Sequence, residues 1–294
     1  MASKRILVAG ATGKQGGAVV SHLRSGAYGE FDVFGLTRDA TSDAARELES
    51  AGVHVVEGDL TDRATLDAAL EGMDGAFLVT TFFESGVDVE TEQGETFVDA
   101  CADAGVEHLV YASVGEADGD TGLAHFESKH AVERHIRERG VPATVLRPVF
   151  FMQNFEGLLG DGLDEGRLAM PMAEGVELEM VDVDDIGAVA AIAFANPDEY
   201  VGETIQLAGD SLTLAEMAEA FETVLGRDVE PEYVPIEDAR AAMGDEMADM
   251  FDWFDRVGYD TDRDALAVRT GHAFADFETY LAEHWGERRR PASA

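Results

Sequence analysis

The chain has 294 residues, with 60 Asp or Glu against 21 Lys or Arg, so its formal charge is −39 at pH 7. A nucleic-acid partner is disfavoured, because neutralising phosphates requires a basic surface. The 46% of hydrophobic residues argue against intrinsic disorder, and no apolar run approaches the roughly 18 residues that predict a membrane-spanning helix.

Lysine is almost absent: the only three are Lys4, Lys14 and Lys129, beside 18 arginines. The acidic residues are spread along the chain rather than gathered in a tail. This composition resembles that of proteins from salt-in halophiles, and an acidic mesophilic protein is the alternative. At about 1 M salt the Debye length is only about 3 Å, so repulsion between surface carboxylates would be largely screened.

The first half of the chain alternates between short β-branched runs and amphipathic helical stretches. Strands are predicted at 5–10, 32–37, 53–58, 75–80, 108–113 and 143–148, with helices between them such as 62–72 and 128–140. Strands and helices alternating every 20 to 30 residues or so indicate parallel βαβ units. The runs are apolar throughout, as expected of strands buried on both faces. We therefore predict an α/β fold with a Rossmann-type, doubly wound parallel sheet.

The alternation breaks after Pro148. A segment rich in Phe, Met and Gly is followed by predicted helices at 182–196, 213–226 and 236–254 and a strand at 203–209. This pattern predicts a smaller, α-rich C-terminal lobe. We place the boundary at residue 150, with a dinucleotide-binding domain over 1–150 and a substrate or cap lobe over 151–294. No Ser/Pro-rich linker separates the two, so they are expected to form one integrated unit.

The single cysteine and the N-terminal residues indicate where in the cell the protein is expected. Cys101 has no possible intrachain disulfide partner and lies in an apolar-periodic helix, where it is expected to pack as a small hydrophobe. The start, "MASKR", runs directly into a predicted strand without the apolar region of a signal peptide. We therefore expect a cytoplasmic protein, either monomeric or homodimeric.

A glycine-rich stretch, "VAGATGKQGG", follows the first predicted strand and opens a predicted helix. In this position Gly10, Gly13 and Gly16, with Thr12, predict a dinucleotide-binding turn. Glycines let backbone N–H groups approach a pyrophosphate closely, and the start of the helix favours the negative charge. An ordinary strand-to-helix turn would not require three spaced glycines.

The end of the second strand reads "GLTRD" and bears on which dinucleotide binds. An NAD site usually places an acidic residue here, whereas this chain has Thr37 and Arg38, with Lys14 in the glycine loop. Arginine suits a phosphate because it donates two parallel hydrogen bonds. NADP(H) is therefore predicted in preference to NAD(H), and an exposed Arg38 paired with Asp39 is the alternative.

Two further residues lie at the ends of predicted strands. Asp59, in "EGDL", is a candidate for contacting the adenine, and an N-cap of the following helix is the alternative. Thr80, at the end of the fourth strand, is a candidate cofactor contact.

The motifs "GATGKQGG", "LTRD", "GDL" and "HFESKH", with "VPATVLRPVFFMQNF" at 141–155, together resemble the NmrA-like family of atypical short-chain dehydrogenases. The resemblance covers nearly the full chain. It implies a Rossmann domain that binds NADP(H), with a cleft beside a C-terminal lobe. It also implies one of two functions: reduction of quinones, azo compounds or similar planar acceptors, or redox sensing through a regulatory protein partner without turnover.

The stretch "HFESK" occupies the place of the Tyr-x-x-x-Lys pair of typical short-chain dehydrogenases. The resemblance assigns Lys129 to the nicotinamide ribose, while His125 replaces the tyrosine that delivers the proton. His125 is either a substitute general acid, since a histidine titrates near neutral pH, or a structural residue. Ser113, in "YASVG", fits the substrate-orienting serine of the superfamily.

The acceptor site is predicted from aromatic residues near the nicotinamide end. Phe82 and Phe150 are the candidate contacts, and Asn154 could fix a polar group, although core packing is the more general explanation for the Phe and Met residues of this region. A flat, apolar acceptor is expected. No metal is predicted, because His125, His130 and His135 are five residues apart, which turns their side chains off a common helix face.

Overall fold

The computed structural model describes residues 3–286. It divides into two compact units: the first comprises Met1–Pro148 and Ile186–Gln206, and the second comprises Val149–Asp185 and Leu207–Ala294. The predicted division at residue 150 assigned 186–206 to the second lobe, whereas in the structure these residues belong to the first unit. The two units are described separately below.

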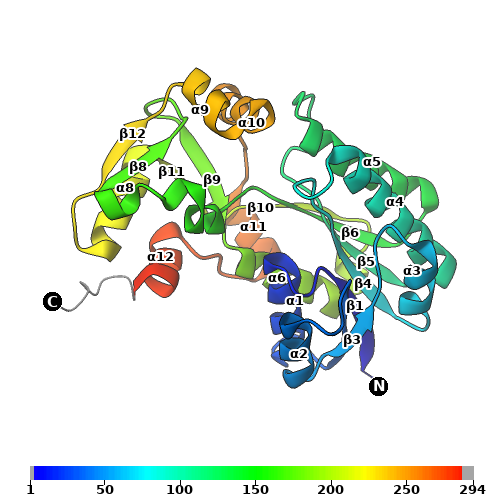
Figure 1. The fold of residues 1–294 in the computed structure, drawn as a ribbon. Helices are drawn as coiled ribbons and strands as arrows, with labels where there is room; N and C mark the ends of the chain where they lie inside the picture. Colours follow the sequence, from blue (N-terminus) through cyan, green and yellow to red (C-terminus); the bar gives the residue numbers. More distant parts are fainter. Residues whose placement is uncertain (1–2, 287–294) are drawn as a thin grey trace. The chain divides into compact units, whose positions relative to one another are not determined.

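The first unit is built on a seven-stranded sheet with the order β10-β6-β5-β4-β1-β2-β3 (Figure 1). All pairings from β6 to β3 are parallel. The strands are β1 (Lys4–Ala9), β2 (Phe31–Thr37), β3 (His54–Glu57), β4 (Gly75–Val79), β5 (His108–Ala112), β6 (Ala143–Pro148) and β10 (Thr204–Leu207). The predicted Rossmann-type, doubly wound sheet is therefore confirmed. Chain order reverses between β1 and β4, where ligands bind such sheets, beyond the carboxyl ends of the strands.

Helices cover both faces of this sheet. They are α1 (Lys14–Arg24), α2 (Asp43–Ser50), α3 (Arg63–Leu70), α4 (Val87–Ala104), α5 (Ala124–Arg139), α6 (Val183–Ala195) and α7 (Pro197–Tyr200). The helices α3, α4 and α5 lie on one face, and α1, α2 and α6 lie on the other (Figure 1). Helix α5 begins four residues before the predicted start at 128, which places both His125 and Lys129 on it.

The core between the sheet and helices α3, α4 and α5 requires small residues where the helices pack closely. A Cβ atom on Gly94 would lie 2.3 Å from Val132 Cγ2, so glycine lets α4 and α5 pack closely. Cys101 is fully buried in the same cluster, as predicted, and burial raises the pKa of its thiol. None of the helices in residues 3–286 combines the length and hydropathy needed to span a membrane.

The second unit is less purely helical than predicted, because it contains two small sheets, β11-β9-β7 and β12-β8. Its strands are β7 (Phe150–Phe151), β8 (Arg167–Met170), β9 (Glu177–Val181), β11 (Asp210–Thr213) and β12 (Glu230–Tyr233). Its helices are η1 (Met152–Glu156), η2 (Leu158–Gly160), η3 (Leu163–Glu165), α8 (Leu214–Leu225), α9 (Ile236–Met243), α10 (Asp245–Arg256), α11 (Arg263–Thr270) and α12 (Phe277–Trp285).

Two predicted helices of this unit have different outcomes. The helix predicted at 213–226 is confirmed as α8, with a capping box between Thr213 and Glu216 and Gly226 at its end. The single helix predicted at 236–254 is wrong, because Gly244, with φ of 88°, ends α9 and starts α10. A positive φ is readily adopted by glycine and cannot continue a right-handed helix.

Candidate functional site

The glycine turn after β1 is shaped so that side chains would not fit. Gly10 has φ of 66°, and its carbonyl oxygen accepts a hydrogen bond from Gly13 N at 2.8 Å. A Cβ atom on Gly16 would lie 2.1 Å from Gly10 O. Glycine at 16 therefore lets the start of α1 pack directly against the turn, as a dinucleotide-binding loop requires.

The start of α1 is exceptional in this acidic chain. Gly13 is its N-cap, no side chain caps it, and its first turn has no acidic residue. Every other α-helix in residues 3–286 has a side-chain cap or an acid in its first turn. Thr12, Gly13 and Lys14 are exposed. With no side-chain cap and no acid in its first turn, the start of α1 is a place where the helix dipole attracts an anion.

Arg38, predicted to read a 2′-phosphate, lies just beyond β2 and is exposed. Its guanidinium donates two hydrogen bonds to the Glu84 carboxylate, at 2.7 and 3.1 Å, and this contact raises the pKa of Arg38. The alternative pairing with Asp39 is not found, because the Asp39 carboxylate accepts hydrogen bonds from Thr41 instead. Glu84 lies in the loop that follows β4, on the other side of the point where the strand order reverses. In the structure Arg38 therefore binds a carboxylate.

The other two residues predicted near the adenosine end are engaged in local turns. Thr37 Oγ1 lies 3.4 Å from Asp39 N, and the Asp59 carboxylate accepts from Thr61 N and Oγ1 at 2.8 Å each. The turn contacts lower the pKa of Asp59. The alternative that Asp59 is the N-cap of the next helix is wrong, since Asp62 caps α3.

Lys129 is held at the carboxyl end of β4. Its Nζ donates to Thr80 O at 2.6 Å and to Thr80 Oγ1 at 3.0 Å, and it lies 2.9 Å from Glu90 Oε1. Glu90 is fully buried in the first turn of α4, and its Oε2 accepts from Ser128 Oγ at 2.6 Å. Thr80 and Lys129, both predicted for the cofactor, are therefore in direct contact with each other.

His125 lies one helical turn before Lys129 on α5 and is only 8% exposed. Its ring is 4.9 Å from the Phe82 ring and 4.8 Å, edge to face, from the Phe126 ring. Phe83, beside Phe82, is 75% exposed. The structure thus brings the predicted His125 and Phe82 together at the loop after β4.

Ser113, predicted to orient a substrate, follows β5 and is buried. Its Oγ donates to Glu133 Oε1 at 2.6 Å. Glu133 is fully buried and accepts hydrogen bonds from Arg147 Nε at 2.9 Å and from Arg147 Nη2 at 2.7 Å. The hydroxyl hydrogen of Ser113 is therefore committed to a carboxylate, which leaves the oxygen as a hydrogen-bond acceptor.

Phe150 and Asn154 belong to the second unit. Phe150 is buried among the rings of Phe155, Phe251 and Phe254, at centroid distances of 6.0 to 6.2 Å. Asn154 lies in η1 and is exposed. The packing explains Phe150 as part of a core.

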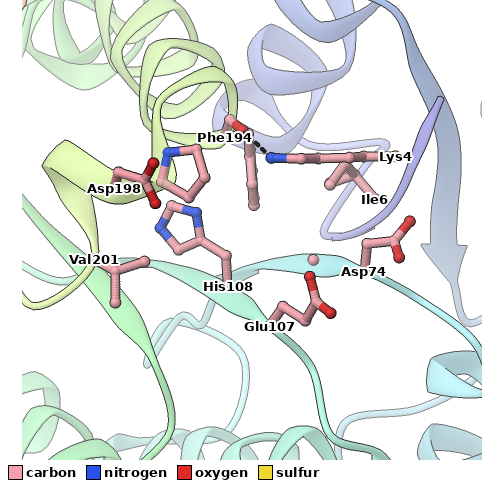
Figure 2. Close-up of a pocket in the computed structure, with 10 residues that line it drawn as sticks. Lys4, Ile6, Asp74, Glu107, His108, Phe194, Asp198 and Val201 are labelled. Carbon is pink, nitrogen blue, oxygen red and sulfur yellow. Dashed lines mark hydrogen bonds between the residues drawn. The ribbon is translucent and has the colours of Figure 1, made fainter. Parts of the chain in front are cut away.

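A pocket of about 460 Å³ lies at the opposite edge of the sheet, at the amino ends of its strands (Figure 2). Lys4, Gly75 and His108, which line it, are the first residues of β1, β4 and β5. Parallel α/β sheets bind their ligands at the carboxyl ends. We therefore do not assign the dinucleotide to this pocket. Among residues 3–286, no group of three His, Cys, Asp or Glu side chains could hold a metal ion.

His108, in the wall of this pocket, has a fixed tautomer. Thr144 Oγ1 donates its hydrogen to Tyr200 O at 2.7 Å, so it accepts from His108 Nε2, at 2.8 Å. Within the described part of the chain, His108 Nδ1 is buried without a hydrogen-bond partner. Burial, with a smaller effect of Lys4, lowers the pKa of His108 to about 4.

This histidine predicts an acid-labile contribution to folding. Its pKa of about 4 in the folded protein lies below the unfolded value near 6.5, so the stabilisation is complete above about pH 6.5 and is lost as pH falls toward 4. Between pH 7.5 and 5 the free energy of unfolding should fall by about 2 kcal/mol more in wild type than in His108→Gln. Urea unfolding of both proteins at high salt measures the difference, and parallel pH profiles would contradict it.

The NmrA-like family model matches residues 2–281. The chain belongs to the NmrA-like family. It is 32% identical over 241 residues to an NAD(P)H azoreductase of Xenophilus azovorans, covering 81% of this chain and 80% of the relative.

Solved structures agree on the fold. An NADPH-dependent quinone oxidoreductase of Escherichia coli, complexed with NADPH, superposes with a TM-score of 0.83 at 23% identity, covering 95% of this chain and 99% of that one. NmrA itself, a negative transcriptional regulator in complex with NADP, gives 0.79 at 20% identity, covering 98% and 97%. At these identities the likeness establishes the NmrA-like fold and leaves the activity to be argued from the site.

Sequence reasoning missed the buried carboxylates of this NmrA-like site. Glu90 shares a helix face with the buried Gly94, Phe97 and Cys101, and Glu133 lies on the buried side of α5. An acid at an apolar-face position was the available indication. This indication was hard to notice because the chain contains 60 acidic residues.

Proposed function

We propose that the protein is an NADPH-dependent oxidoreductase that reduces a small, planar, apolar acceptor such as a quinone. The observation that carries the proposal is the start of α1. It packs against a glycine turn and has no side-chain cap and no acid in its first turn, in a chain of charge −39. It lies at the reversal point of the sheet, where a dinucleotide pyrophosphate would be bound. The relationship to an azoreductase supports a planar acceptor.

Each part of the site then has a role. Gly10, Gly13 and Gly16 bring backbone N–H groups to the pyrophosphate, and Thr37, Arg38 and Lys14 bind the 2′-phosphate. Lys129, fixed on Thr80, places a positive charge by the nicotinamide ribose. Bound NADPH would supply the hydride.

The hydrogen bonds of the site limit which side chain can donate the proton to the acceptor. Ser113 donates its hydrogen to Glu133, and Lys129 donates to Thr80 and meets Glu90. His125 is therefore the proposed donor, because it lies against Phe82, where a flat acceptor would stack. A structural role for His125 remains the alternative, and His125→Phe separates the two: it should lower turnover and leave NADPH affinity unchanged if the histidine donates.

The test is NADPH oxidation by the purified protein in about 3 M KCl across a panel of quinones and azo dyes. Enzyme-dependent loss of absorbance at 340 nm with at least one acceptor is expected, and it should saturate with acceptor concentration. Tight NADPH binding with no oxidation by any acceptor would overturn the oxidoreductase proposal.

The second candidate is a non-catalytic NADP(H) sensor that acts on a regulatory protein partner. It is favoured by His125 in place of the usual tyrosine and by the shared fold of the regulator NmrA. A sensor needs different affinities of its partner for the dinucleotide-bound and free states. Robust turnover in the assay above would exclude sensing as the only function.

Replacing Arg38 should change cofactor preference. Charge-assisted hydrogen bonds contribute roughly 1.5–3 kcal/mol, so Arg38→Ala should weaken NADPH binding by about tenfold or more. NADH affinity should be nearly unchanged, since NADH lacks the phosphate. Isothermal titration of both cofactors measures this, and equal losses for the two would mean that Arg38 does not contact the 2′-phosphate.

Glu84→Gln is the matched control for this change. The Glu84 carboxylate accepts hydrogen bonds from both terminal nitrogens of the Arg38 guanidinium in the structure. An exposed ion pair competes only weakly with the phosphate, so NADPH should bind up to about fivefold more tightly in this variant. In the Arg38→Ala background the same substitution should have a smaller effect.

A further inference from the structure

Glu90 is a buried carboxylate to which the sequence motifs assign no role. It is fully inaccessible to solvent, in the first turn of α4. Its Oε1 lies 2.9 Å from Lys129 Nζ and accepts from Thr80 Oγ1 at 3.3 Å, while its Oε2 accepts from Ser128 Oγ at 2.6 Å. Both oxygens are thus bound by residues from β4's carboxyl end and from α5.

The ammonium of Lys129 has three hydrogens to donate. In the structure they meet three oxygens: Thr80 O at 2.6 Å, Glu90 Oε1 at 2.9 Å and Thr80 Oγ1 at 3.0 Å. The ammonium is therefore fixed in place by the protein alone. What Lys129 offers a neighbouring ligand is a positive charge at a defined point rather than a mobile donor.

That charge depends on Glu90. Burial lowers the pKa of Lys129, and the Glu90 carboxylate opposes this effect. Tyr111 on β5, whose ring centroid is 6.0 Å from Nζ, is neutral because burial raises its pKa. Thr80 and Ser128 are uncharged. The buried face of α5 also carries His125 and Glu133, and Glu133 is paired with Arg147. Among the described residues, Glu90 is the one carboxylate within 4.0 Å of Nζ.

We infer that Glu90 is a positioning residue of the cofactor site: it keeps Lys129 protonated in a buried place and aligns its ammonium on Thr80. The inference rests on the proposed function in one respect, that Lys129 serves the dinucleotide. It also explains why lysine is retained at 129 in a chain that otherwise uses arginine, since three converging oxygens at one point suit a compact ammonium better than a planar fork.

The scarcity of lysine makes the test direct. With ¹³Cε-labelled lysine, the protein gives three resonances, and Lys129→Arg assigns the one from Lys129. Its pKa is measured by titration without cofactor at high salt, in wild type and in Glu90→Gln. We expect the pKa of Lys129 to fall by about one unit or more in Glu90→Gln, as for loss of an adjacent opposite charge. An unchanged value would overturn the inference.

Glu92→Gln is the matched control, because Glu92 is an exposed acid on the same helix. It removes one negative charge and should leave the Lys129 titration in place. If Glu90→Gln does not fold, Glu90→Asp is measured instead. Its shorter arm weakens the contact while keeping the charge, so the pKa of Lys129 should fall by less, and no change would again contradict the inference.

A second readout connects the pair to the cofactor. The NADPH dissociation constant is measured from pH 7 to 9.5 in the same proteins. Affinity should decline at a lower pH in Glu90→Gln than in wild type, and Glu90→Asp should restore much of the wild-type profile. Profiles of identical shape would show that Glu90 acts only on stability. Because the lysine titration needs no cofactor, failure of wild type to bind NADPH would overturn the proposed function and leave the result on Glu90 standing.

Discussion

Lys129→Met is expected to destabilise the protein by about 3–5 kcal/mol, because it leaves the buried Glu90 carboxylate without its cation. Glu90 is 0% exposed, and within residues 3–286 its remaining hydrogen-bond donors would be the hydroxyl groups of Ser128 and Thr80. The folded fraction should also lose NADPH affinity and any hydride transfer, since the positive charge by the nicotinamide ribose is gone. Denaturant unfolding and calorimetric NADPH titration, in one high-salt buffer, measure the two effects separately.

Two variants control this experiment. Lys14→Met removes an exposed lysine and should change the free energy of unfolding by no more than about 1 kcal/mol. Lys129→Met combined with Glu90→Gln removes both charges and should recover a large part of the lost stability, because no uncompensated charge stays buried. If Lys129→Met is as stable as wild type, or binds NADPH as tightly, the role given to "HFESK" is wrong.

Salt should have the second large effect. Because the chain has 60 acidic and 21 basic residues, at least 39 carboxylates have no cation of their own. Several acids share one cation in places: Glu237, Asp245 and Asp249 all lie within 4.0 Å of Arg240. The Debye length shortens from about 10 Å at 0.1 M to about 3 Å at 1 M, so like-charge repulsion between exposed acids is screened. We expect the fold to loosen below roughly 0.5 M salt.

Circular dichroism melts from 0.1 to 3 M KCl measure this dependence. The melting temperature should rise by on the order of 10 °C. At about 2–4 °C per kcal/mol, this corresponds to a gain of roughly 3–5 kcal/mol in the free energy of unfolding. Sucrose, which stabilises by exclusion from the surface without screening charge, is the control at low salt. A melting temperature that does not change across the KCl range would rule out the halophilic interpretation.

The sheet could be predicted because its indications are local. Apolar runs such as 75–80 and 108–113 have the length and spacing of buried parallel strands, and the structure confirms them as β4 and β5. The glycine turn is local as well, since Gly10, Gly13 and Gly16 follow one another at intervals of three residues. The break at Gly244 was missed because an isolated glycine in a helical pattern is often tolerated.

The pairing of charged groups could not be predicted, because it depends on tertiary contacts. Arg38 meets Glu84, 46 residues away, rather than the adjacent Asp39. Lys129 meets Glu90 and Thr80, which precede it in the chain by 39 and 49 residues. With 60 acids in the chain, sequence offers many partners for each cation, and only the fold selects among them.

The most direct test of the central claim, a dinucleotide site at the start of α1 that favours NADPH, is calorimetric titration of the wild-type protein in about 3 M KCl. NADPH should bind at one site per chain, at least about tenfold more tightly than NADH, as one charge-assisted contact to the phosphate predicts. Absence of NADPH binding, or equal affinity for the two cofactors, would contradict the account.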